Sequence, residues 1–171
     1  MPKTPLPLII GTLETPIGTI RAGAHDGGLA RVLFAAQKKE DLPVDPHPSK
    51  AARDHLTAAL TALDAYFQGN KQDFSELTLA PSGTDFQLSV WRALTRIGYG
   101  ETCAYRDIAT AIGNPRAVRA VGLANGKNPI PVIVPCHRVI GADGSLTGFG
   151  GGLPAKKWLL EHEGVLDRPL I

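Results

Sequence analysis

Cys136 and His137 are the two neighbouring side chains whose types point most directly to chemistry. A thiol with an ordinary pKa near 8.5 is only about 3% ionised at pH 7, so a nucleophilic cysteine needs a base. An imidazole held by a carboxylate can take the thiol proton, and Glu161 or Glu163 could supply that carboxylate. Because adjacent side chains rarely point the same way, we expect a water molecule to bridge Cys136 and His137. The alternative is a structural thiol, since free cysteine packs as a small apolar residue.

The segment that leads to Cys136 is apolar and stiff. Pro129, Pro131 and Pro135 restrict its backbone, and the run 131–134 predicts a buried strand or extended segment. Polar side chains follow Cys136 at once, which favours a reactive thiol over a structural one.

The cysteine content limits the other kinds of site. Two cysteines are too few for a disulfide scaffold or for four-thiolate zinc coordination. Cys103 has no adjacent histidine, so we interpret it as structural. We therefore expect no metal and no cofactor, and reduced thiols predict a cytoplasmic protein.

Positive charge is concentrated in one window of the chain. The formal net charge is only +2, yet residues 92–138 hold seven Lys and Arg against two acidic residues. The basic residues are Arg92, Arg96, Arg106, Arg116, Arg119, Lys127 and Arg138. This window favours a polyanionic partner such as nucleic acid, and a solvated basic face is the alternative.

Two short helices are predicted inside this basic window. They cover residues 105–112 and 116–124, and the turn Gly113-Asn114-Pro115 separates them. Asn114 is the expected N-cap of the second helix, with Pro115 at its first position. Two short helices around a glycine-containing turn are typical of a helix-turn-helix, although many such hairpins bind nothing.

Two further helices flank this pair. Thr84 and Gln87 form a capping-box pattern that begins the first of them. The second begins at Pro154, after the glycine-rich loop 148–152, and Gly164 ends it.

The N-terminal half predicts a small α+β unit. The segments 8–14, 17–24 and 28–35 are typical of strands joined by tight turns, and the segment 74–80 could add another. Ser49 offers the N-cap of a helix that runs to about Gln68. The domains we predict are residues 1–80, with strands and this helix, and residues 81–171, with the helix pair in the basic window and the candidate nucleophile Cys136.

Composition excludes several classes of protein. The chain is 43% hydrophobic and 20% charged over 171 residues, which suits one core of moderate size or two small ones. Since no run approaches about 18 apolar residues, we expect no membrane span, and the N-terminus does not read as a secretory signal. A monomer is the simplest assumption.

The segment from about Thr84 to Gly164 resembles the O6-alkylguanine-DNA alkyltransferases, also called methylated-DNA–protein-cysteine methyltransferases. Pro135-Cys136-His137-Arg138-Val139 is similar to the active-site signature of that family. Other motifs match the family in order and spacing. Those before Cys136 are Tyr105, Gly113-Asn114-Pro115, Arg119-Ala120-Val121-Gly122 and Asn128-Pro129. Those after it are Gly151-Gly152-Leu153, Lys157-Trp158-Leu159-Leu160 and His162-Glu163-Gly164. The N-terminal half is similar only in its pattern of strands and helix.

The resemblance implies an α+β fold. A small N-terminal α/β domain, ribonuclease-H-like, would pack on a helical C-terminal domain with a winged-helix-type helix-turn-helix. It also implies a DNA repair protein that acts once, moving the alkyl group of O6-alkylguanine to Cys136 without cofactor or protein partner. O4-alkylthymine is a further candidate substrate.

The same resemblance assigns catalytic roles. Cys136 would be the nucleophile, His137 the base acting through water, and Glu163 the carboxylate that orients His137. Asn128 would hold the active-site turn by hydrogen bonds. A carboxylate near a helix C-terminus is unfavourably placed, so Glu163 needs a compensating partner, for which His137 is the candidate.

Further residues would bind the substrate base. Tyr105 would contact guanine N3, the amide of Gly150 would face the guanine oxygen, and the carbonyl groups of Cys136 and Val139 would accept from the guanine amino group. Phe149 lies in the same loop as Gly150. Many relatives have Tyr in place of Phe149 and Ser or Ala in place of Gly150, so the substrate range of this chain could differ.

DNA contacts would come from the second helix of the helix-turn-helix, lying in the minor groove of double-stranded DNA. Arg119 would fill the base stack after the damaged nucleotide leaves it. The small side chains of Ala117 and Ala120 would permit close approach of this helix.

Three other interpretations remain. Related proteins that recognise alkylated guanine without chemistry typically have Trp at the position of Cys136, which argues against a non-catalytic sensor. A helix-turn-helix regulator with a structural cysteine is the next alternative. A cysteine hydrolase fits less well, because no oxyanion-hole arrangement is evident and the basic window would have no use.

Overall fold

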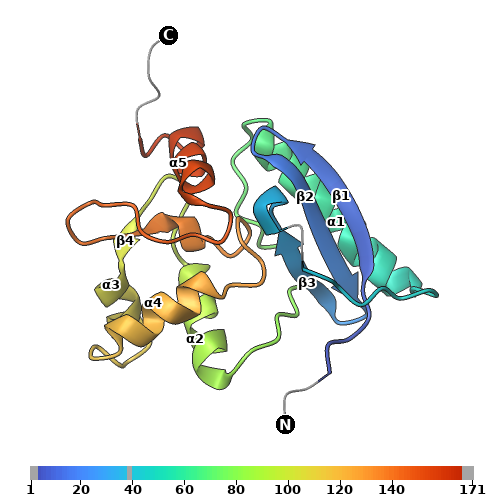
Figure 1. Ribbon diagram of the computed structural model, residues 1–171, viewed down its shortest axis with the longest axis horizontal. Coiled ribbons are helices and arrows are strands. Elements are labelled where there is room, and N and C mark those ends of the chain that lie inside the picture. Colours follow the sequence, from blue (N-terminus) through green and yellow to red (C-terminus); the bar gives the residue numbers. More distant parts are fainter. Residues whose placement is uncertain (1–3, 38–39, 167–171) are drawn as a thin grey trace. The chain divides into compact units, whose positions relative to one another are not determined.

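The chain forms two compact units. The computed structural model describes residues 4–37 and 40–166 (Figure 1). The first unit covers Met1–Ser82 and the second Gly83–Ile171. The α+β class, with a small N-terminal sheet and a helical C-terminal half, is confirmed.

The first unit is built on an antiparallel sheet in the order β1-β2-β3. The strands are β1 (Ile9–Thr15), β2 (Gly18–His25) and β3 (Gly28–Leu33), close to the three predicted segments. The segment 74–80 does not extend the sheet as a strand. Within it, Leu79 makes a single bridge with Leu29.

Helix α1 (Lys50–Phe67) packs against this sheet (Figure 1). The Ser49 hydroxyl accepts from the backbone N–H of Ala52 at 3.0 Å, which confirms the predicted N-cap. The helix lies close to β1 at Gly11, where a Cβ atom would be only 2.8 Å from Leu60 Cδ1. A short 3-10 helix, η1 (Ala35–Gln37), follows the sheet.

The second unit contains the predicted helix-turn-helix, formed by α3 (Tyr105–Ala111) and α4 (Val118–Gly126). Helix α2 (Asp85–Leu94) begins at the predicted capping box and packs on both. The indole Nε1 of Trp91 donates to the carbonyl oxygen of Ala124 at 2.9 Å and so ties α2 to α4.

The start of α4 differs from the prediction. Residues 115–116 form a separate turn, closed by a hydrogen bond from the N–H of Ala117 to the carbonyl of Asn114 at 3.0 Å. The N-cap is therefore Ala117 rather than Asn114, and it gives no side-chain hydrogen bond. The Asn-Pro signal marks the turn and not the first helical residue.

The run 131–134 was wrongly predicted as extended. Ile130, Val132, Ile133 and Val134 are buried as expected, but they form a tight turn, closed by a hydrogen bond from Val134 N–H to Ile130 O at 2.9 Å. Val132 has a positive φ of 70° at its centre. An apolar run predicts burial but does not distinguish a strand from a compact turn.

Three small elements complete the second unit. The 3-10 helix η2 (Cys136–Arg138) follows the turn and leads into β5 (Val139–Ile140), which pairs in parallel with β4 (Cys103–Ala104). Helix α5 (Leu153–His162) closes the fold and contacts η2. None of the described helices has the length and apolar character needed to cross a bilayer.

Candidate active site

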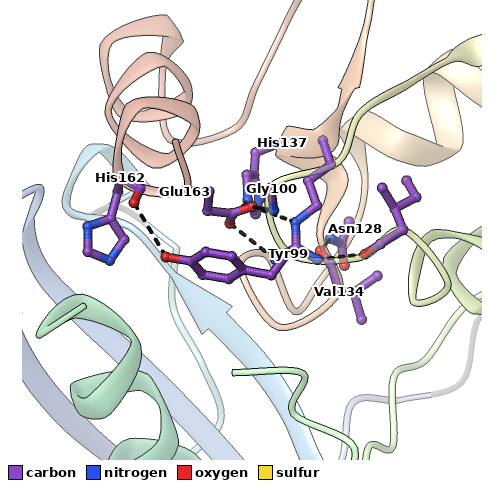
Figure 2. A network of polar contacts seen from close by, with 9 residues as sticks. Tyr99, Gly100, Asn128, Val134, His137, His162 and Glu163 are labelled. Atoms are coloured by element: carbon purple, nitrogen blue, oxygen red, sulfur yellow. Dashed lines mark hydrogen bonds and ion pairs between the residues drawn. The ribbon is translucent and has the colours of Figure 1, made fainter. Parts of the chain in front are cut away.

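A hydrogen-bonded turn holds the backbone in front of Cys136. The side-chain amide of Asn128 donates to Val134 O at 2.7 Å, and its oxygen accepts from Ile130 N–H at 2.9 Å (Figure 2). The N–H of Cys136 also donates to Val134 O, at 2.8 Å. Asn128 therefore ties together the turn that precedes Cys136.

Cys136 lies buried at the start of η2, with 4% of its surface exposed. Burial raises the pKa of its thiol to about 11, while a hydrogen bond from Asn128 and the charge of Lys156 partly oppose that rise. At neutral pH the thiol is therefore protonated. A reaction at this sulfur needs a neighbouring group that can take its proton.

His137 is the neighbouring base and is fully buried. Its Nε2 lies 2.6 Å from Glu163 Oε2, so the imidazole donates from Nε2 to the carboxylate. Burial lowers the pKa of His137, the charges of Arg138 and Lys156 lower it further, and Glu163 acts in the opposite direction. Nδ1 is buried and has no hydrogen-bond partner among the described residues, which leaves its lone pair to accept a proton.

Glu163 is the C-cap of α5 and collects four donors. Besides His137, it accepts from Arg138 Nε at 2.7 Å and Nη2 at 3.2 Å, and from the N–H of Gly100 at 3.3 Å. Gly100 has a positive φ of 79°, a conformation in which glycine is unstrained, and this turn aims its N–H at the carboxylate. Figure 2 shows Glu163 beside Gly100 and His137.

Lys156 is a second buried cation in the cluster. Its Nζ donates to Val139 O at 2.7 Å and to Thr147 O at 3.1 Å. The hydroxyl groups of Thr147 and Tyr105 lie 2.5 Å apart. These contacts connect Tyr105 and Val139, two residues that the sequence assigned to the substrate base, through Lys156.

The residues predicted to contact DNA lie on a different element. Arg119 is exposed on α4 and Ala117 directly precedes that helix. Helix α4 nevertheless reaches the nucleophile through its last turn, where Asn125 Nδ2 donates to Cys136 O at 3.4 Å. The structure thus links α4 to η2 without bringing Arg119 into the buried cluster.

The loop before α5 carries Phe149 and Gly150. Phe149 is half-buried, Gly150 is exposed, and the Phe149 carbonyl accepts from Gly152 N–H at 2.9 Å. Their assignment to the substrate stays a prediction.

Sequence reasoning missed the roles of two buried cations, Arg138 and Lys156. Arg138 entered the sequence analysis as one basic residue of the window 92–138 and as part of the signature motif, without a role of its own. A signal for Lys156 was present, because it shares one helical face with Leu159, Leu160 and Glu163 at spacings of three, four and seven residues. A charged residue on a buried helix face indicates a partner inside the protein.

Two family models match the chain. The model for the DNA binding domain of 6-O-methylguanine DNA methyltransferase matches residues 85–165. The model for the ribonuclease-like domain of the same family matches residues 8–81.

Individual relatives agree with these models. The methylated-DNA–protein-cysteine methyltransferase of Methanosarcina barkeri is 50% identical over 152 residues, which cover 88% of this chain and 94% of that protein. The protein of that name from Mycobacterium bovis is 47% identical over 152 residues, 89% of this chain and 90% of that one. A crystal structure of Mycobacterium tuberculosis OGT in complex with DNA has a TM-score of 0.79 and 45% identity, covering 91% of this chain and 92% of that one.

A buried thiol beside an imidazole–carboxylate pair, next to a helix-turn-helix, defines a DNA-binding protein with a nucleophilic cysteine. The chain belongs to the 6-O-methylguanine DNA methyltransferase family, as its motifs predicted.

Proposed function

We infer that the chain repairs DNA by moving the alkyl group of O6-alkylguanine to Cys136. The observation that carries this inference is the placement of Cys136, buried beside a His137 whose Nε2 is held by Glu163 at 2.6 Å. The relatives named methylated-DNA–protein-cysteine methyltransferase support it.

The chemistry is one displacement at carbon. The S–H bond of Cys136 breaks and its proton passes to His137 Nδ1, through a bridging water. The sulfur electron pair then forms the S–C bond while the C–O bond breaks, and guanine leaves with that electron pair and takes up a proton. The product is a thioether, and the site offers no second nucleophile to cleave it, so each chain acts once.

The alkylated base must leave the duplex to reach a buried sulfur, at a cost of a few kcal/mol. We assign the supporting contact to Arg119, exposed on α4, with Ala117 small enough for that helix to approach the minor groove. Six of the seven basic residues in the window 92–138 are exposed and favour phosphate contacts, whereas Arg138 is buried in its ion pair with Glu163.

The flipped base would lie between Tyr105, the loop at Phe149 and Gly150, and the carbonyl of Val139. That carbonyl already accepts from Lys156 at 2.7 Å. A carbonyl oxygen has two lone pairs, so the guanine amino group would use the second. Lys156 then fixes the acceptor that reads the base.

The same proposal includes the oligomeric state of the protein and the compartment in which it acts. All catalytic groups come from one chain, which supports a monomer that needs no protein partner. Both cysteines are free thiols, and a reaction at sulfur requires a reducing compartment such as the cytoplasm.

Peptide mass spectrometry tests the proposal after incubation with a duplex that contains one O6-methylguanine. One added methyl group on the peptide with Cys136, saturating at one per chain, is expected, and Cys103 serves as the internal control. A Cys136→Ser variant should bind the duplex and take up no methyl. Tight binding by the natural chain with Cys136 unmodified would instead indicate a damage sensor.

A further inference from the structure

Arg138 grips the same carboxylate that orients His137. Its Nε donates to Glu163 Oε1 at 2.7 Å and its Nη2 to Oε2 at 3.2 Å, and Oε2 is the oxygen that faces His137. Its Nη1 donates to the carbonyl of Ile97 at 2.6 Å. The side chains of Arg138 and Glu163 are 5% and 0% exposed, so this ion pair is shielded from water.

The charges in this cluster disfavour a protonated His137. A guanidinium keeps its charge at every accessible pH, so Arg138 already balances the carboxylate of Glu163. A protonated His137 would be a second cation on that carboxylate, and the ammonium of Lys156 is buried in the same cluster. A buried charge without its own counter-ion is costly, so the neutral imidazole is favoured.

The charged groups that act on His137 come from two elements. Glu163 and Lys156 approach from α5, and Arg138 adjoins it in η2, as does the thiol of Cys136. Of these, Glu163 alone favours a proton on the imidazole, whereas Arg138 and Lys156 oppose it. Arg138 is the cation that touches Glu163 directly.

We propose that Arg138 is a positioning residue that keeps His137 neutral by occupying both oxygens of Glu163. The imidazole then donates at Nε2 and accepts the thiol proton at Nδ1. Without Arg138, the unbalanced carboxylate would hold an imidazolium, and the base would carry a proton before any substrate arrived. This inference rests on the proposed function, because it concerns the base that serves Cys136.

Nitrogen NMR of the imidazole groups tests the charge state without any substrate. In the natural chain, His137 should be neutral at pH 7 with its hydrogen on Nε2. In an Arg138→Met variant, its titration midpoint should rise by about 1 to 3 pH units, the usual effect of one nearby charge. Arg138→Lys keeps the positive charge and should leave His137 neutral at pH 7.

A matched control comes from the other unit, where Arg31 pairs with Glu40. Arg31→Met removes an arginine from a partly buried ion pair and should leave the titration of His137 unchanged. An imidazolium at pH 7 in the natural chain would overturn the proposal. So would an unshifted midpoint in Arg138→Met, or an imidazolium in Arg138→Lys. The natural chain and Arg138→Lys decide the matter even where Arg138→Met does not fold.

Single-turnover kinetics give the second readout. The acid limb of methyl transfer should move to higher pH in Arg138→Met, with the rate recovering at high pH, and Arg138→Lys should restore the natural profile. A purely structural role would lower the plateau without moving the limb. Should the natural chain transfer no methyl group, the proposed function fails, while NMR still decides the role of Arg138.

Discussion

The amide of Asn128 and the N–H of Cys136 meet at one acceptor, the carbonyl oxygen of Val134, at 2.7 and 2.8 Å. The side-chain oxygen of Asn128 is also engaged, by the N–H of Ile130. One side chain thus fixes both ends of the turn from which the nucleophile emerges. The position of the sulfur therefore depends on this turn.

Asn128→Ala should therefore weaken both the fold and the reaction. It leaves the Ile130 N–H without its acceptor, and an unpaired buried polar group costs about 1–3 kcal/mol. We expect the free energy of unfolding to fall by that amount and methyl transfer to slow, measured by urea unfolding and by single-turnover kinetics. Asn70→Ala, at an exposed position after α1, is the control and should match the natural chain. Equal stability of the two variants would contradict this role.

Lys156→Met should reduce the reactivity of Cys136. The charge of Lys156 opposes the rise in the thiol pKa, so its loss should raise that pKa further, by about one unit. Alkylation of Cys136 by iodoacetamide and methyl transfer should each slow by about tenfold at pH 8. The neighbouring Lys157 is exposed and lies 3.9 Å from Glu161, so Lys157→Met is the matched control. Natural rates in Lys156→Met would show that its charge does not act on the thiol.

The free energy of unfolding should fall at mildly acidic pH because of His137. Its pKa is lowered in the folded state, chiefly by burial, so below about pH 6.5 the unfolded chain binds the extra proton. The neutral His137 therefore contributes fully to the free energy of unfolding above that pH. This contribution is lost as the pH falls, at up to about 1.4 kcal/mol per pH unit. Between pH 7.5 and 5.5, the natural chain should lose more thermal stability than His137→Gln.

The exposed His47 provides the comparison for that measurement. His47→Gln should keep the natural dependence of the melting temperature on pH. If His137→Gln and His47→Gln gave the same pH dependence, burial of a neutral His137 would not be the cause.

Arg119→Ala should separate base flipping from sulfur chemistry. Arg119 is exposed on α4 and outside the buried cluster, so its loss should slow repair in a duplex far more than reaction with free O6-methylguanine base. Arg106→Ala, exposed on α3, removes the same charge from the first helix and is the control. Equal losses on duplex and free base would refute the role of Arg119.

Local signals predicted most of the elements. Ser49 and Thr84 begin α1 and α2 because their side chains satisfy free backbone N–H groups, a property that a sequence displays directly. The start of α4 was missed because Asn114-Pro115 suits both an N-cap and an ordinary turn. The choice depends on how α4 packs, through contacts such as that between Trp91 and Ala124, which local sequence does not contain.

The site was predictable where chemistry demands particular side chains and not where packing decides the partner. Cys136, His137 and Glu163 follow from the need for a thiol, a base and a carboxylate, together with a known motif. Arg138 binds the carbonyl of Ile97 and the carboxylate of Glu163. Lys156 binds the carbonyls of Val139 and Thr147. Backbone acceptors carry no signature in a sequence, so these contacts required the fold.

The burial of Cys136 also protects the chain from accidental reagents. A thiol whose pKa is raised to about 11 reacts slowly with soluble electrophiles and oxidants, which attack the thiolate. A chain that reacts once and is not regenerated would be inactivated by the first such reagent that modified its thiol. A thiol that stays protonated until an alkylated guanine lies beside it reserves each molecule for a lesion, so the low reactivity of the free protein contributes to its selectivity.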